Sequence, residues 1–232
     1  MTAIVTHRPT RRALLAGAAG AGTLLLLPAC ATYGPAFTLE EAVRRMLLLA
    51  SENAFARLTQ PGGYWDEQVA RVGLGTMLGT RGDVLSRILT SALFKQRLEE
   101  RFATLAIDAS YRAAPVVTDA VRVIGVRNAI DLVRGGPTAA SAYLRAEVGS
   151  RLIDAVVPEL GQAIRVSRDP LLGEALNAVT GVDVAAVAER VGRVVDDAVW
   201  GEIAREEAAI RANPRATRDP AIIAVFGAAG AV

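Results

Sequence analysis

The chain has 232 residues and a formal net charge of +2, with one histidine and one cysteine. The histidine, His7, lies in the N-terminal segment, so the rest of the chain cannot form Ser-His-Asp or Cys-His nucleophilic sites, zinc sites of His and Cys, or haem held by His. Residues 1–29 hold three of the 26 basic residues and no acid, which leaves 23 basic against 24 acidic residues and excludes nucleic acid as a partner.

The first 29 residues have the pattern of a signal peptide. Thr10 is followed by the pair Arg11 and Arg12, and an uncharged, Gly- and Ala-rich run then extends to Leu27. This run is shorter than the ~20 residues of a transmembrane helix. The arginine pair before a weakly apolar run predicts export by the twin-arginine route, with Arg11 and Arg12 as the export signal. An ordinary N-terminal anchor with a chance arginine pair is the alternative.

Cys30 follows the apolar run directly and predicts a lipoprotein. A free exposed thiol is a liability in an oxidising compartment, which favours acylation over a spare thiol beside a non-lipid cleavage site. Two acyl chains anchor a protein stably where one does not. We therefore expect a lipidated tether over residues 30–37 and a membrane as partner, on the periplasmic side of the cell envelope. Ala31 favours the outer membrane if the host is Gram-negative.

Helical patterns follow the tether. Thr38, with Glu41 three residues later, predicts a capping box, and apolar residues at helical spacing continue to Leu58. Pro61 to Gly63 ends this helix, and the glycine-rich stretch 64–82 is expected to form a loop. Asp83 is expected to cap a helix that continues toward Ala113.

The middle of the chain predicts several further helices. Pro115 is expected to begin one and Gly125 to interrupt it. A short helix over 129–134 should end at Gly135 and Gly136, and a helix beginning at Pro137 and Thr138 should kink or restart at Pro158.

The last third contains the longest pattern. Residues 168–182 are broken by Pro and Gly, Asp183 caps a helix to Ile210, and Pro220 begins a last helix to Phe226. Sustained strand alternation and repeats of fixed period are absent. We expect one compact all-α domain of roughly eight helices over residues 38–227, with a flexible tail at 228–232.

Two segments resemble a known bacterial family. Residues 129–140 are similar to a family stretch with Gly-Gly-Asp-Thr-Ala-Ala, and residues 206–217, followed by 225–227, match a Glu-Glu-x-x-Ile-Arg-x-x-Pro segment. The chain is identified as a member of the domain of unknown function 4197 family, over about residues 39–227. The resemblance implies an exported, all-helical protein and supplies no catalytic residue. At 107–112 the family's usual Asn, Arg and Glu are replaced.

Each candidate for chemistry has a structural alternative that we favour. Carboxylate pairs at 99–100, 196–197 and 206–207 point about 100° apart on a helix, so we expect solvated faces and no shared substrate. Ser91 and Lys95 lack dyad spacing and are expected to form a surface pair. Trp200 is expected in the core. An ion-paired helix end is expected for the basic residues Arg211, Arg215 and Arg218.

Gly135, Gly136, Pro137 and Thr138 are interpreted as a structural turn. Glycines before a helix start can hold an anion, but this segment lacks a phosphate-loop lysine, and Pro137 removes one backbone donor. We expect a helix C-cap and tight turn, with a left-handed backbone that glycine tolerates.

The sequence favours a non-catalytic binding or structural module of the envelope. The alternatives are a carrier of a lipid or other apolar ligand in an inter-helix cavity and, third, an unrecognised hydrolase. Carboxylate-only Mg or Ca sites stay open, but there is no calcium-loop pattern, and we expect no metal and no cofactor.

Overall fold

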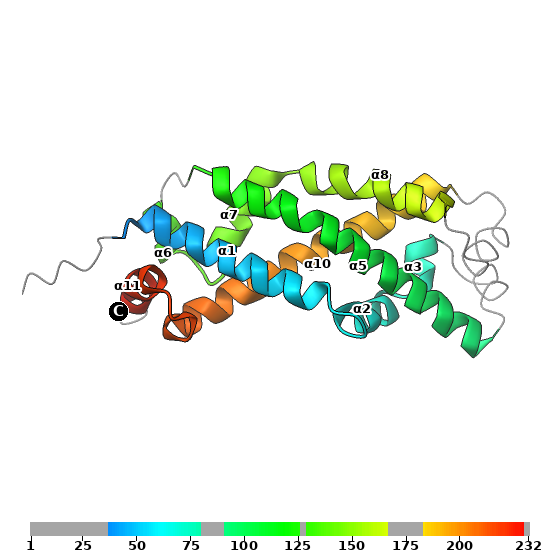
Figure 1. The fold of residues 1–232 in the computed structure, drawn as a ribbon, viewed down its shortest axis with the longest axis horizontal. Helices are drawn as coiled ribbons and strands as arrows, with labels where there is room; N and C mark the ends of the chain where they lie inside the picture. Colours follow the sequence, from blue (N-terminus) through cyan, green and yellow to red (C-terminus); the bar gives the residue numbers. More distant parts are fainter. Residues whose placement is uncertain (1–36, 80–90, 126–128, 167–182, 230–232) are drawn as a thin grey trace, which may run out of the picture. The chain divides into compact units, whose positions relative to one another are not determined.

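The structure is a computed structural model that describes residues 37–79, 91–125, 129–166 and 183–229. All of these residues belong to one compact unit, Phe37–Val232. Within the described ranges the chain forms nine α-helices, one 3-10 helix and no strand, so the all-α prediction is confirmed. The elements are α1 (Leu39–Leu58), α2 (Tyr64–Val72), α3 (Leu74–Leu78), α5 (Ala92–Val123), α6 (Ala129–Arg134), α7 (Ala139–Val148), α8 (Arg151–Val166), α10 (Val184–Ala212), η1 (Pro214–Thr217) and α11 (Pro220–Ala229) (Figure 1).

Several expected features lie outside the described residues. These are the signal with Arg11 and Arg12, the lipidation site Cys30, the cap Asp83 and the broken segment 168–182.

Polar caps begin the helices where the sequence predicts them. Thr38 accepts a hydrogen bond from the Glu41 N–H at 3.1 Å, and Asp183 accepts one from the Ala185 N–H at 2.9 Å. Each cap satisfies a backbone donor that the first helical turn leaves free. The starts of α1 and α10 are therefore encoded locally.

The prediction of a loop after Tyr64 is wrong, because this stretch forms α2 and α3. Trp65 and Val69 of α2 are fully buried, and so are most of the apolar side chains of α3. Gly73 lies between the two helices with φ +79°, a conformation that costs a residue with a Cβ. The glycine marks a junction between short helices, which are held by burial of their apolar residues.

Pro115 does not begin a helix. It lies inside α5, which runs unbroken from Ala92 to Val123. Proline removes the hydrogen bond to the carbonyl four residues earlier, here that of Tyr111. Both residues are exposed, so water can bind this carbonyl at little cost. Ile124 then ends the helix, close to the expected interruption at Gly125.

The break after the helix that follows Thr138 lies at Gly149, not at Pro158. Gly149 ends α7 with φ +56°, and α8 continues through Pro158, which is exposed. A positive φ stops an α-helix outright, whereas a solvent-facing proline removes only one hydrogen bond. The turn at Gly149 therefore separates α7 from α8.

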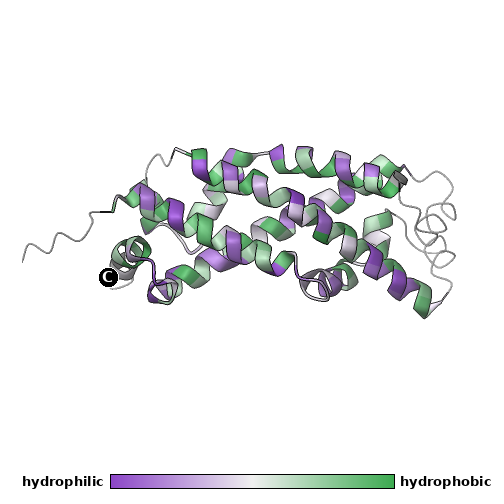
Figure 2. Ribbon diagram, in the orientation of Figure 1, coloured by the Kyte–Doolittle hydropathy of each residue, from purple (hydrophilic) through white to green (hydrophobic). Residues whose placement is uncertain are grey.

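Helix α10 is central to the packing. It contacts α8, α1, α7, α5 and α3. Its Gly192 lies so close to α8 that an added Cβ would lie 2.6 Å from a methyl of Val157. Figure 2 shows that the long helices carry both hydrophobic and hydrophilic residues along their length, and the buried ones form one aliphatic core. This core holds both α1 and α7 against α10.

Candidate functional site

The two segments that carry the family resemblance meet where α7 begins beside α10. The carboxylate of Glu207 in α10 is fully buried. It accepts hydrogen bonds from the backbone N–H of Ala140 at 3.0 Å and of Ser141 at 2.6 Å. These N–H groups belong to the first turn of α7, where a helix has free donors and a positive dipole end. The anion at this helix N-terminus is therefore the protein's own glutamate.

Arg211 completes the same buried cluster one turn further along α10. Its Nε donates to Glu207 at 2.7 Å, and its two terminal nitrogens donate to the carbonyls of Leu132 and Val133 at 2.7 and 3.1 Å. Its guanidinium also lies 4.8 Å from the centre of the Phe226 ring in α11. Glu207 and Arg211 thus join α6, α7, α10 and α11. We call these two residues the buried clasp.

The turn between α6 and α7 is tight, but its backbone is not left-handed. Neither Gly135 nor Gly136 has a positive φ, so the predicted left-handed C-cap is wrong. A Cβ on Gly135 would lie 2.6 Å from the Cβ of Ala139 and 2.9 Å from the carbonyl oxygen of Asp131, whereas a Cβ on Gly136 meets nothing within 4 Å. Crowding, not φ, therefore restricts position 135.

Pro137 and Thr138 lead into α7 as expected, with Thr138 in the N-cap position. The Thr138 side chain makes no capping hydrogen bond. Its carbonyl accepts the Ser141 hydroxyl at 3.1 Å, and Glu207 takes over the capping of the backbone N–H groups. The cap of α7 comes from a residue distant in sequence.

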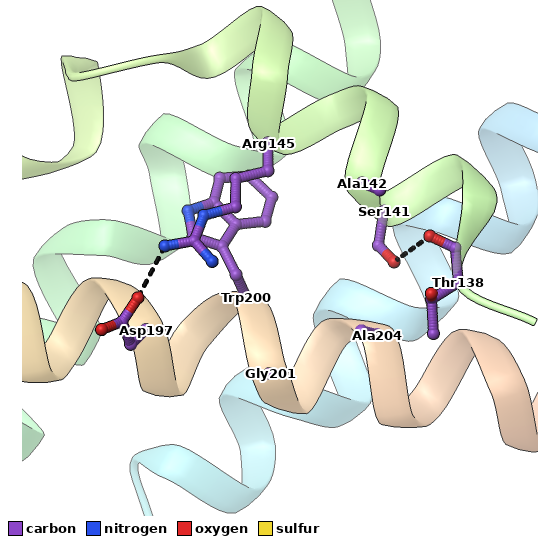
Figure 3. A pocket seen from close by; sticks show the side chains of 8 residues that line it. All are labelled: Thr138, Ser141, Ala142, Arg145, Asp197, Trp200, Gly201 and Ala204. Carbon is purple, nitrogen blue, oxygen red and sulfur yellow. Dashed lines mark hydrogen bonds and ion pairs between the residues drawn. The ribbon is translucent and has the colours of Figure 1, made fainter.

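An open cleft of about 240 Å³ lies beside this turn, between α7 and α10 (Figure 3). From α7 and its cap come Thr138, Ser141, Ala142 and Arg145, and from α10 come Asp197, Trp200, Gly201 and Ala204. We call it the α7–α10 cleft. Small residues on both helices leave the space, while Arg145 and Asp197 supply opposite charges at one end.

Arg145 bridges two adjacent carboxylates at the charged end of the cleft. Its Nη2 lies 2.8 Å from Asp196 and 2.7 Å from Asp197. The expected solvated face is wrong for Asp196. Partial burial acts to lower the pKa of Arg145, but Asp197 and Asp196 outweigh it and hold the pKa above its usual value. Asp196 is buried and also accepts the Trp200 indole N–H at 3.0 Å. Trp200 is in the core, as predicted.

The carboxylates at 206 and 207 do point apart. Glu206 interacts with Arg205 and with Asn53 of α1, while Glu207 faces α7. The prediction of a solvated face is nevertheless wrong for Glu207. Adjacent positions on one helix thus serve two different neighbours.

Glu206 lines a second cleft, of about 370 Å³, between α1 and the end of α10. Beside it, Arg45 binds Asp219, the residue before α11, at 3.2 Å. Burial acts to raise the pKa of Asp219, but hydrogen bonds from the Ile222 and Ala221 N–H groups and from Arg45 hold it below its usual value. These contacts fix α1 against α11.

The remaining sequence candidates either have partners within the protein or are exposed. Ser91 caps α5 by accepting from the Phe94 N–H at 3.1 Å, and Lys95 lies 3.7 Å from Glu99, so the two do not act together. Of the three C-terminal arginines, Arg211 is ion-paired as expected. The expectation is wrong for Arg215 and Arg218, which are exposed and form no ion pair with a described residue.

The sequence analysis did not predict that Asp196 and Glu207 are buried, although their positions on α10 indicate it. Both positions fall on the apolar stripe of α10 that includes Val199, Ile203 and Ile210. An acid on such a stripe, with an arginine one turn later in the case of Glu207, indicates a buried ion pair. The partner in α7 could not be identified in this way.

Two further properties concern the described residues alone. No group of three or more His, Cys, Asp or Glu side chains among them is arranged to hold a metal ion. None of the helices within these ranges combines the length and apolarity that crossing a bilayer requires.

The fold and this site define an all-helical domain whose family segments form a buried ion-paired junction. Residues 35–227 match the model of the family described as protein of unknown function (DUF4197), and the chain belongs to that family. No curated protein matched the chain, and no solved structure did.

Proposed function

We propose that this protein is an exported, lipid-anchored, non-catalytic module that binds a partner through the α7–α10 cleft. The signal-like residues 1–29 and the single cysteine at position 30 support the anchor on the periplasmic side of the envelope. The open cleft beside the family's Gly-Gly-x-Thr turn is the observation that carries the binding role.

A non-catalytic role is supported by the way the buried acids are used. Glu207 binds Arg211, Asp196 binds Arg145, and Glu202 binds Arg205 at 2.9 Å. A general acid or base must exchange a proton with a substrate within hydrogen-bond reach. These carboxylates instead accept hydrogen bonds from the protein itself, so their positions serve the fold.

The size and lining of the α7–α10 cleft suit an anchoring side chain of a protein partner. Its volume of about 240 Å³ lies below the ~300–1,000 Å³ of typical small-molecule pockets. Protein interfaces often bury one large side chain in such a recess, surrounded by polar groups. Thr138, Arg145 and Asp197 supply those polar groups here.

Site-specific photo-crosslinking tests the cleft. A photoreactive residue at the exposed Ala142 should give a defined adduct in cells, and one at the exposed Ala155 of α8 should not. Gly201→Arg should abolish the Ala142 adduct by filling the cleft. A Cβ at position 201 meets nothing within 4 Å, so this variant should keep its melting temperature. Equal adducts at both positions, or an adduct that survives Gly201→Arg, would contradict the proposal.

The anchor is tested separately. Mass spectrometry should detect acyl chains on the wild-type N-terminus, and Cys30→Ser should remove them and release the protein from the membrane fraction. Arg11→Lys with Arg12→Lys keeps the charge but changes the recognised geometry, so precursor should accumulate in the cytoplasm. An unmodified wild-type cysteine would refute lipidation, and normal export of the lysine variant would indicate the general secretory route.

A further inference from the structure

The end of the domain where α1 begins is built from four elements that hold one another. Helix α1 contacts α6 and α11, and α11 contacts α6 and η1 (Figure 1). Arg45 of α1 binds Asp219 before α11. Arg44 of α1 also donates to the carbonyl of Ile124, just after α5, at 3.4 Å. We call this surface the tether end, because the segment that follows Cys30 enters the domain here.

Large apolar side chains are exposed at the tether end. Val123, at the end of α5, is 79 % exposed, Ile130 of α6 is 46 % exposed, and Leu39, the first residue of α1, is 38 % exposed. Leaving such side chains in water forgoes the free energy of burial, and a group of them marks an interaction surface.

The same elements carry arginines without acidic partners. Within the described residues, the exposed side chains of Arg134, Arg215 and Arg218 form no ion pair. Three carboxylates nearby are already engaged, since Glu40 and Glu41 bind Arg44 and Arg45, and Asp219 binds Arg45. Asp131 of α6 adds one exposed acid. Among these residues five arginines stand against four acids, an excess of one positive charge.

The length of chain before α1 limits what can cover this surface. Six residues lie between Cys30 and Phe37, and the seven Cα-to-Cα steps that join the two span at most about 25 Å when fully extended. A lipid on Cys30 would therefore keep the tether end within that distance of the bilayer. An end of the domain that carries both exposed apolar groups and free arginines matches the apolar and anionic layers of a phospholipid surface.

We infer that the tether end docks directly on an anionic phospholipid bilayer, with Val123 and Ile130 at the interface and Arg134, Arg215 and Arg218 near the headgroups. This inference rests on the proposed lipid anchor for its geometry. Because residues 30–232 are slightly acidic overall, anionic lipid would attract this end and repel the rest of the domain, which orients the α7–α10 cleft relative to the membrane.

Vesicle binding by the unacylated protein tests this inference. The mature chain, residues 30–232 with Cys30→Ser, contains the whole compact unit Phe37–Val232 and no lipid. Co-sedimentation compares vesicles of phosphatidylcholine with vesicles that also contain a quarter phosphatidylglycerol. A basic residue near an anionic surface contributes about 1 kcal/mol, or roughly fivefold in affinity. Changing Arg134, Arg215 and Arg218 together to Gln should therefore weaken binding to the anionic vesicles about a hundredfold.

A matched control separates docking from net charge. Arg71, Arg97 and Arg193 are exposed on α2, α5 and α10, and changing them to Gln alters the net charge by the same amount. This control should bind as the parent does, while Val123→Ser with Ile130→Ser should bind more weakly. Equal losses in both arginine triples, or no binding of the parent to anionic vesicles, would overturn docking. Neither result would bear on the proposed lipid anchor, which is tested separately by measuring whether wild-type Cys30 is acylated.

Discussion

Removing the carboxylate of Glu207 should destabilise the domain more than any surface substitution. Glu207→Ala deletes the acceptor of two backbone N–H groups and leaves Arg211 without its counter-charge. The side chain of Arg211 is 11 % exposed, so water replaces little of what is lost. Breaking one partner out of a buried ion pair costs about 3–5 kcal/mol. A domain of this size loses about 2–4 °C of melting temperature per kcal/mol, which predicts a decrease of about 6–20 °C.

Thermal unfolding followed by circular dichroism measures this effect. Glu207→Gln retains the shape but turns an amide toward groups that donate hydrogen bonds, so it should also destabilise. Glu206→Gln is the matched control, because it changes the neighbouring carboxylate, which forms an ion pair with the exposed Arg205 and accepts a hydrogen bond from Asn53. Its melting temperature should change by less than about 3 °C, as for a surface pair. If Glu207→Ala melted within 2 °C of wild type, the argument for the buried clasp would fail.

Three further outcomes follow from the same contacts. Gly135→Ala should lower the melting temperature, because its Cβ would lie 2.6 Å from that of Ala139. Gly136→Ala should be neutral or slightly stabilising, because its Cβ would meet nothing within 4 Å. Equal effects of the two substitutions would contradict the crowding argument. The pKa of Asp219 is lowered in the folded state, so its contribution is complete above its unfolded value near 4 and is lost as pH falls through the folded value. Denaturant unfolding of wild type below about pH 4 should therefore show a steeper loss of stability than that of Asp219→Asn, and parallel curves would refute this. Ser110→Ala should cost about 1–3 kcal/mol in the same assay, because it leaves the buried Trp65 indole N–H without its 3.1 Å acceptor, and an unchanged stability would argue against that hydrogen bond.

Helices whose signals are local could be predicted from the sequence. The caps Thr38 and Asp183 and the short helix after residue 128 lie where the pattern placed them. Predictions of secondary structure failed where burial of apolar side chains outweighs the local content of glycine. The glycine-rich stretch after Tyr64 folds as two helices because Trp65 and its apolar neighbours are buried by the core.

The candidate site was less predictable, because its partners are distant in sequence. Glu207 and the N–H of Ala140 are 67 positions apart, and Arg211 and the carbonyl of Leu132 are 79 apart. Helical periodicity places residues on a face but does not identify what packs against that face. The turn at Gly135 was located correctly from sequence, while the reason for its glycine, the closeness of Ala139, required coordinates.

The buried clasp also determines when folding can finish during synthesis. The first turn of α7 emerges from the ribosome long before Glu207 exists to bind its N–H groups, and α6 similarly precedes Arg211. At about 5–20 residues per second, a separation of 67 positions corresponds to roughly 3–13 s. During that interval the turn between α6 and α7 lacks Glu207 and Arg211, the two residues that bind it in the folded domain. In chains truncated before residue 211, this turn should therefore be accessible to proteases and chaperones, even where the individual helices have already formed.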